Sequence, residues 1–139
     1  MSPVDKELEE SVAAMLGIGY PKLSNENTEE FLLKWGEENA IRNVILETKH
    51  GEIELELFDE TPLHSLNFLY KIHRQYYTET EFTRVVHEFV IQGGNSEEET
   101  PQQQRFLIGQ HMLKPEFNEK MVHVRGALAM SRSYSNNPD

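Results

Sequence analysis

The sequence predicts a mainly β protein with helices, in which a helical N-terminal extension precedes a domain of antiparallel strands. Apolar residues within residues 1–43 recur at helical spacing, and in the segment 52–58 they recur at every second position. A period near 3.6 is typical of amphipathic helices, and a period of two is typical of half-buried strands. The chain of 139 residues has the length of one domain plus an extension. We therefore predict an extension at 1–43 and a domain at 44–139.

The extension predicts two short helices. An apolar stripe precedes Gly17, with spacings of four, four, three and one between Val4, Leu8, Val12, Met15 and Leu16. A second helix is predicted to begin at the N-cap Asn27, with Glu30 in a capping-box arrangement, and to end at Gly36. Two interpretations stay open: the helices pack on the side of the main domain, or they dock a protein partner.

A hairpin is predicted next. Residues 44–48 form a strand candidate, and His50-Gly51 marks the turn. In 52–58 the apolar residues alternate with glutamates, which is the pattern of an antiparallel strand with one face in water. Thr61-Pro62 then predicts the start of a helix.

The segment 81–94 combines β-patterned apolar residues with one arginine, Arg84. A charge inside such a segment is costly unless it is paired or used. From pattern alone, Arg84 fits a paired residue at a sheet rim, Phe89 fits a core residue, and Gly93-Gly94 fits a turn. The polar run 95–104 predicts a loop.

The same segment closely resembles the signature of cyclophilins, the peptidyl-prolyl cis-trans isomerases. Their pattern is Phe-His-Arg-Val-Ile, a short turn, and Phe-Met-Ile-Gln-Gly-Gly. Thr83 replaces the usual His and Val90 the usual Met. The matching residues are Phe82, Arg84, Phe89, Ile91, Gln92, Gly93 and Gly94. Further blocks follow the family order at 48–53, Asn67-Phe68, Glu116-Phe117 and the strand-like 123–132. The resemblance covers 44–139 and implies a cyclophilin-like antiparallel β-barrel.

The implied chemistry is rotation about the Xaa-Pro bond in proline-containing peptides or unfolded proteins. Amide resonance imposes a barrier of roughly 18–20 kcal/mol. Twisting returns the lone pair to the proline nitrogen, and an arginine that donates to this nitrogen favours the twisted state. The resemblance makes Arg84 that catalytic group and implies no cofactor and no metal. The implied substrate-binding residues are Phe89 and Val90 in the proline pocket, Gln92 beside Arg84 or the peptide, and Ser131 and Arg132 along an extended substrate.

A second function class stays open: a non-catalytic module of the same fold that binds proline peptides or a protein. The 13 basic and 24 acidic residues give a net charge of −11, which argues against nucleic acid or an anionic membrane as partner. The acidic start lacks an apolar leader, so we expect a soluble, cytoplasmic protein. The absence of cysteine excludes disulfides.

The sequence stops at Asp139, where cyclophilins continue with further strands. Because a barrel closes only when every strand is present, we expect a barrel that is incomplete at the C-terminus. Two explanations stay open: the sequence is a portion of a longer protein, or a short form completes its sheet with another chain. The six histidines lack metal-ligand spacing and are interpreted as surface or hydrogen-bonded core residues.

Overall fold

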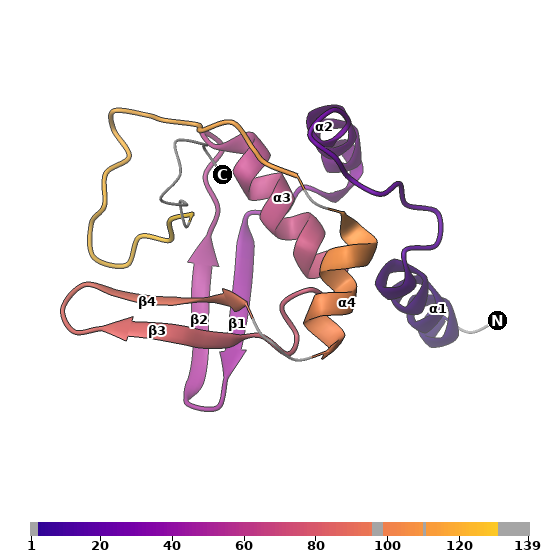
Figure 1. Cartoon of the computed structure of the whole chain (residues 1–139), viewed down its shortest axis with the longest axis horizontal. Coiled ribbons are helices and arrows are strands. Elements are labelled where there is room, and N and C mark those ends of the chain that lie inside the picture. The colour runs from indigo at the N-terminus through magenta and orange to yellow at the C-terminus, as the bar shows by residue number, and fades with distance from the viewer. Residues whose placement is uncertain (1–2, 96–98, 110, 131–139) are drawn as a thin grey trace. The chain divides into compact units, whose positions relative to one another are not determined.

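The computed structural model describes residues 3–95, 99–109 and 111–130 (Figure 1). The elements in chain order are α1 (Pro3–Leu16), α2 (Thr28–Asn39), β1 (Asn43–Thr48), β2 (Gly51–Glu56), α3 (Pro62–His73), β3 (Glu81–Val86), β4 (Val90–Asn95) and α4 (Glu99–Ile108). They form two compact units. The first contains Met1–Ser24 and Tyr70–Gln110, and the second contains Asn25–Leu69 and His111–Asp139. The boundary therefore falls within α3.

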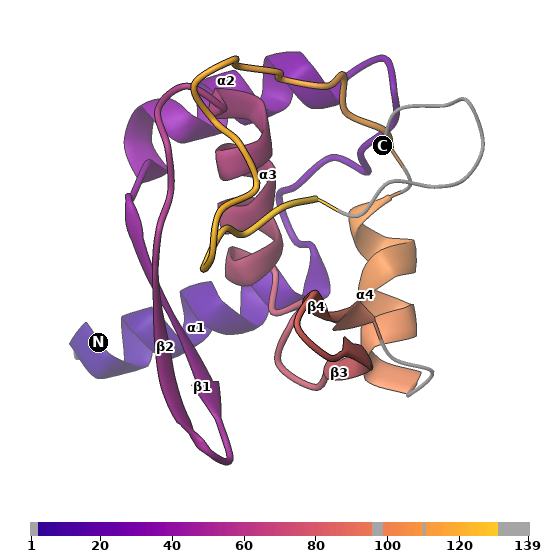
Figure 2. The ribbon, with the colours of Figure 1, turned by 90° about the vertical axis from the view of Figure 1, so that its left-hand side faces the viewer.

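In the second unit, the predicted hairpin is confirmed. β1 and β2 pair antiparallel, with Val44 opposite Leu55 and Leu46 opposite Ile53. These four residues share one face, because directly opposed residues point to the same side of a sheet. At the turn, the Thr48 hydroxyl donates to the Gly51 carbonyl at 2.8 Å and accepts from the His50 amide at 3.1 Å. Figure 2 shows the hairpin as a twisted two-stranded ribbon.

Helix α2 begins where the sequence predicts, but it does not end there. Asn27 occupies the N-cap position, yet its side chain makes no cap hydrogen bond, so the predicted capping box does not form. The predicted end at Gly36 is also wrong, because the helix continues to Asn39. Gly36 is buried, and a Cβ added there would lie 2.6 Å from Leu66 Cδ2. This glycine permits close packing of two helices rather than ending one.

Helix α3 starts at Pro62, as predicted, and a distant carboxylate caps it. The two Glu116 oxygens accept hydrogen bonds from the amides of Leu63 at 3.1 Å and His64 at 2.7 Å. The same carboxylate contacts the His64 ring at Nδ1, 2.7 Å away. The first turn of a helix has amides without helical partners, so an acceptor there stabilises it.

In the first unit, the predicted helix at the N-terminus is confirmed as α1, but its apolar stripe does not make the packing contact. Ala14 is buried, whereas Leu8 of the stripe is 63% exposed. The end of α1 is held by polar groups from other elements. Arg74 Nε donates to the Ala14 carbonyl at 2.6 Å, and Gln104 Nε2 donates to the Met15 carbonyl at 2.8 Å.

Helix α4 corrects the prediction of a polar loop at 95–104. Its buried residues include Gln104 and Ile108, which lie one helical turn apart. The periodicity was hidden because a glutamine occupies a buried position. Gly109 follows with a φ of +110°, a conformation that glycine adopts easily after a helix.

Strands within the described ranges form two separate two-stranded antiparallel sheets, and these ranges contain no closed barrel. The strand-like segment at 123–132 is not a strand over its described part, 123–130, where Gly126 adopts a φ of +85°. The barrel therefore stays a prediction. No helix in the ranges that the structure describes has the length and apolar character needed to cross a membrane.

Candidate active site

The segment that carries the cyclophilin-like motif folds as the β3–β4 hairpin. Val86 pairs with Val90, Val85 with Ile91, and Arg84 with Gln92. Residues 87–89 make the turn, and the Phe89 amide donates to the Val86 carbonyl at 3.1 Å. Glu88 reaches the left-handed region with a φ of +57°. The motif is thus a local structure, whose two strands lie close together in sequence.

A bulge lies directly before Arg84. Phe82 opposes Gly93 and Arg84 opposes Gln92, so Thr83 is an extra residue in β3. A bulge bends its strand and redirects the side chains beside it. Thr83, which stands where the family usually has His, therefore occupies the position that sets the direction of Arg84.

Arg84 and Gln92 lie side by side on one face of the hairpin. Arg84 Nη1 donates to Gln92 Oε1 at 3.5 Å, which is a long hydrogen bond at an exposed position. An arginine has five N–H donors in a rigid plane, and this contact uses one of them. The geometry brings together the two polar residues that the sequence predicts for the site and leaves the arginine accessible to a ligand.

The two faces of the hairpin differ in chemistry. Val85 and Ile91 are paired with each other on the face opposite to Arg84, and they are 72% and 57% exposed. One face therefore carries a charge and an amide, and the other carries exposed apolar surface.

Gly93 and Gly94 lie inside β4, so their interpretation as a turn is wrong. A Cβ on Gly93 would lie 2.9 Å from the ring of Phe82, and one on Gly94 would lie 3.1 Å from the ring of Tyr77. Gly94 also has a φ of +94°, which other residues rarely adopt. The glycines allow two aromatic rings to approach the strand. Burial, with a smaller effect from Tyr76, raises the pKa of Tyr77, so this phenol stays neutral near pH 7.

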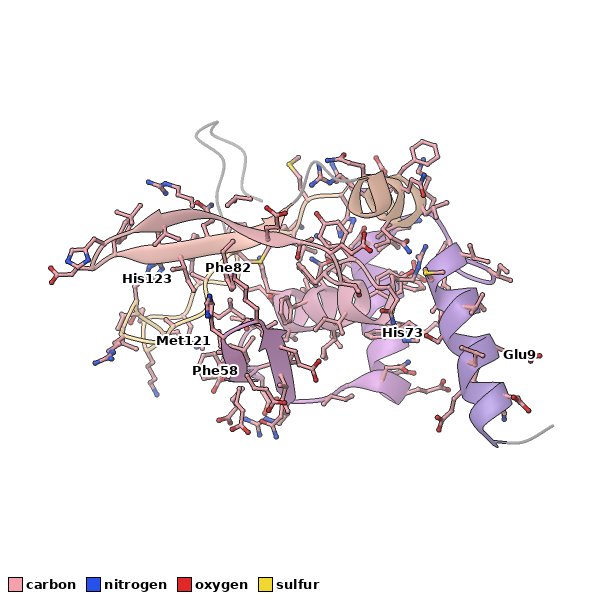
Figure 3. All side chains as sticks on the ribbon, turned by 90° about the horizontal axis from the view of Figure 1, so that it is seen from below. Glu9, Phe58, His73, Phe82, Met121 and His123 are labelled. Carbon is pink, nitrogen blue, oxygen red and sulfur yellow. The ribbon has the colours of Figure 1, made fainter. Side chains whose placement is uncertain are left out.

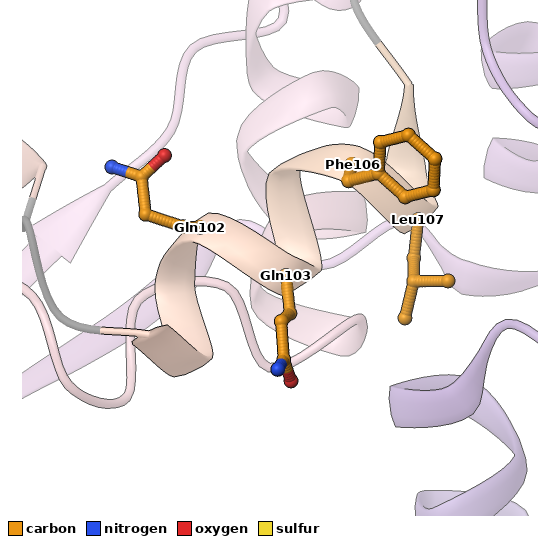
Figure 4. A pocket seen from close by; sticks show the side chains of 4 residues that line it. All are labelled: Gln102, Gln103, Phe106 and Leu107. Atoms are coloured by element: carbon orange, nitrogen blue, oxygen red, sulfur yellow. The ribbon is translucent and has the colours of Figure 1, made fainter.

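The structure describes two of the four residues that the sequence predicts for the pocket and the extended substrate. Phe89 ends the turn with its side chain 71% exposed, and Val90 begins β4 and is half-buried. Ser131 and Arg132 lie outside the described residues. Figure 4 shows a surface hollow of the first unit whose lining residues lie outside the motif; they are the α4 residues Gln102, Gln103, Phe106 and Leu107. Its lining has no titratable group.

The histidines agree with their interpretation from the sequence. His64, His73 and His111 hydrogen bond to Glu116, Tyr20 and Asn67, respectively. His50, His87 and His123 are exposed. Within 3–95, 99–109 and 111–130, no group of three His, Cys, Asp or Glu side chains could hold a metal ion.

Sequence reasoning missed the buried Arg74 cluster of the first unit. Arg74 donates to the Tyr70 hydroxyl at 2.7 Å, and its guanidinium lies 5.3 Å from the ring centre of Tyr20. The position of Arg74 near the end of a helix gives no signal of burial, because its partner Ala14 lies 60 residues away. Burial, together with the Arg74 charge, lowers the pKa of His73.

Comparison with known proteins identifies the family. The family described as cyclophilin type peptidyl-prolyl cis-trans isomerase/CLD matches residues 43–139. A peptidyl-prolyl cis-trans isomerase of Acinetobacter baylyi is 34% identical over 104 residues, which cover 73% of this chain and 52% of the relative. Peptidyl-prolyl cis-trans isomerase B of Escherichia coli is 35% identical over 91 residues, which cover 65% and 53%.

Peptidyl-prolyl cis-trans isomerase-like 3 of Dictyostelium discoideum is 37% identical over 93 residues, which cover 66% of this chain and 56% of the relative. The chain thus spans about half the length of these curated relatives. No solved structure matches it. The family match includes the whole β3–β4 hairpin with Arg84 and Gln92. The chain belongs to the cyclophilin-type peptidyl-prolyl cis-trans isomerase family.

Proposed function

We propose that this chain catalyses cis-trans isomerisation of Xaa-Pro bonds, with Arg84 as the catalytic group. The observation that carries the proposal is the pairing of Arg84 with Gln92 on one accessible face of the β3–β4 hairpin. The family match, which includes this hairpin, supports it. Proline-containing peptides and folding proteins are the proposed substrates, which would give the protein a chaperone-like role.

Arg84 would act on the twisted amide rather than on the planar one. In the planar amide, the proline nitrogen shares its lone pair with the carbonyl, so it accepts hydrogen bonds poorly. When the bond twists, the lone pair returns to nitrogen, and a donor aimed at it stabilises the transition state selectively. Arg84 is always protonated and can donate from a fixed plane, and Gln92 would hold that plane in position. The rotation transfers no atom or electron, so it needs no cofactor.

We further infer that the hairpin belongs to a cyclophilin-like barrel within a domain at 44–139, preceded by the extension at 1–43. Side chains alternate between the inside and the outside of a barrel. The exposed Val85 and Ile91 would then face the interior, and Arg84 would face outward. This arrangement would bury the apolar face that the hairpin exposes.

The substrate would bind on the outer face beside Arg84. Phe89 and Val90 would line the proline pocket, where Val90 gives a shallower wall than the usual Met. Ser131 and Arg132 would contact the peptide in extended form, as an added strand does. We propose a cytoplasmic location, and the net charge of −11 favours peptide over nucleic-acid or membrane partners.

The alternative function is a binding module that holds proline peptides, or a protein partner through 1–43, without catalysis. Thr83 in place of the usual His, and the large exposed fraction of Phe89, favour this alternative. The position of Arg84 beside Gln92 on one accessible face favours the enzyme.

Exchange NMR on a short Xaa-Pro peptide separates the two functions. The wild-type chain is expected to accelerate cis-trans exchange, and Arg84→Ala is expected to lower the acceleration by about 10²–10³-fold, the cost of removing one transition-state donor. Peptide affinity is measured in parallel by titration. Equal rates with retained binding would assign the chain to the binding class.

A further inference from the structure

Helix α1 displays an apolar stripe that it does not use for packing within its own unit. Leu8, Val12, Met15 and Leu16 are 63%, 41%, 37% and 51% exposed, respectively. Their positions at i, i+4, i+7 and i+8 place them on one side of the helix. A continuous stripe of this kind is the usual contact surface between two helices.

The helix is held in place by a different set of groups. Arg74 and Gln104 donate to the carbonyls of Ala14 and Met15 in its last turn. A buried cation at a helix C-terminus also interacts favourably with the helix dipole. Arg74 is fully buried and makes no ion pair within the part of the chain that the structure describes. The hydrogen bonds that hold α1 therefore involve its last turn and leave the apolar stripe exposed.

The family match does not extend to the helix that carries this exposed surface. The family match begins at residue 43, whereas α1 ends at Leu16. The exposed apolar residues on the β3–β4 hairpin are expected to be buried by other strands of the family fold. The stripe on α1 lies outside the family match and needs a separate explanation.

The charge around the stripe identifies the class of partner. Helix α1 contains four acidic residues and one basic residue. At 3.6 residues per turn, Glu9 falls along the same edge of the stripe as Leu16, two turns before it, and Glu7 falls beyond the opposite edge. Figure 3 shows Glu9 projecting from the outer side of α1. A second copy of this acidic helix would bring like charges together, whereas a basic partner would gain from complementary charge.

We propose that the stripe on α1 docks an amphipathic helix of another protein, in which lysine or arginine residues flank an apolar stripe. Because α1 and the β3–β4 hairpin belong to one compact unit, the partner would be tethered to the unit that carries Arg84. This last consequence rests on the proposed isomerase function, but the docking itself does not.

The test uses the full chain and two labelled synthetic helices of about 15 residues, long enough to be helical when bound. Both carry leucine at i, i+3, i+4 and i+7. One has lysines beside this stripe, and the other has glutamates at the same positions. Fluorescence anisotropy is expected to show the lysine peptide binding at least about tenfold more tightly. Equal affinities, or no binding of the lysine peptide, would overturn the proposal.

Variants locate the surface. The double variant Leu8→Ala and Leu16→Ala keeps helix-forming residues and is expected to weaken lysine-peptide binding by at least about tenfold. The matched control, Ile41→Ala with Ile45→Ala, removes two exposed side chains of the other unit and is expected to leave affinity unchanged. Glu7→Lys with Glu9→Lys is expected to reverse the preference between the two peptides.

Three results would contradict the proposal. The first is unchanged binding in the Leu8 and Leu16 double variant while circular dichroism shows an intact fold. The second is retained preference for the lysine peptide after charge reversal. The third is a dimer in sedimentation that the double variant dissolves, which would assign the stripe to a second copy. Arg84→Ala should bind the lysine peptide normally, so failed docking and failed catalysis give different results.

Discussion

Two arginines of the same compact unit have opposite environments. Arg74 is fully buried, and it donates to the Ala14 carbonyl and the Tyr70 hydroxyl within 2.7 Å. Arg84 is exposed, and its hydrogen bond to Gln92 is a long contact of 3.5 Å. Arg74 donates two hydrogen bonds that join α1 to α3. The guanidinium of Arg84 is accessible to a ligand. An arginine used for stability and one suited to ligand binding can therefore be distinguished by whether their donors are buried in the fold or accessible to a ligand.

Replacement of Arg74 should give the largest effect on stability. Arg74→Met keeps an apolar stem but removes the two hydrogen bonds that the buried guanidinium donates to the Ala14 carbonyl and the Tyr70 hydroxyl. We expect a loss of about 3 kcal/mol in the free energy of unfolding. Urea unfolding followed by circular dichroism measures it. The matched Arg84→Met variant should change stability by less than about 0.5 kcal/mol. Similar losses in the two variants would remove the distinction between the arginines.

The Arg84→Lys variant tests whether catalysis needs the planar donors of arginine or only its positive charge. Lysine keeps the charge but lacks the planar set of donors, so it would position a donor at the proline nitrogen less well. We expect the catalysed exchange rate to fall by about 10–100-fold, with the unfolding midpoint unchanged. A variant with the wild-type rate would show that charge alone is sufficient and that donor geometry is not used.

Two carboxylates of the second unit differ in the same way, one hydrogen bonded within the fold and the other exposed. Glu116 caps α3 through two amides and the His64 ring, whereas Glu119 is exposed. Glu116→Ala should lower the free energy of unfolding by about 1–2 kcal/mol, as loss of a helix cap does. Glu119→Ala should be close to neutral. If both variants unfold at the wild-type urea concentration, the cap contributes nothing measurable.

The smallest predicted effect is a pH dependence that comes from His73. Burial and then the Arg74 charge lower the pKa of His73 in the folded state below the ordinary value of 6.5. At a pH between the folded and the unfolded pKa of His73, the unfolded chain binds more protons than the folded one. The contribution of His73 to the free energy of unfolding is therefore fully present above about pH 6.5 and is lost as the pH falls towards the folded pKa. Tyr20, which lies 2.6 Å from His73 Nε2, can donate to the neutral ring.

Unfolding midpoints at pH 7.5 and 5.5 measure this term. The decrease between the two values should be smaller in His73→Gln than in the wild type, because glutamine does not titrate. An equal decrease in both proteins would assign the pH dependence to other groups.

Much of the fold could be predicted because its signals are local. Alternation identified the β1–β2 hairpin, and a family motif within fourteen consecutive residues identified the β3–β4 hairpin. The pairing of Arg84 with Gln92 is local in the same sense, since they are eight positions apart in the sequence. Short-range patterns are what sequence periodicity reports.

The remaining features depend on contacts between distant residues. Arg74 precedes a glutamine near the end of a helix and reads as a surface residue, but its partner is 60 positions away. Helix α4 was missed because Gln104 is buried through its bond to Met15, 89 positions away. Gly93 and Gly94 read as a turn because the approach of Phe82 and Tyr77 is a tertiary contact.

The most direct test of the central claim is an NMR titration of the arginine side-chain Nε–H signals with an Xaa-Pro peptide. The account predicts a saturable shift of the Arg84 signal, assigned by its loss in Arg84→Lys. It also predicts that the Arg74 signal, whose proton is bonded to the Ala14 carbonyl, stays unchanged. An Arg84 signal that does not move while the peptide binds or is isomerised would contradict the role of Arg84.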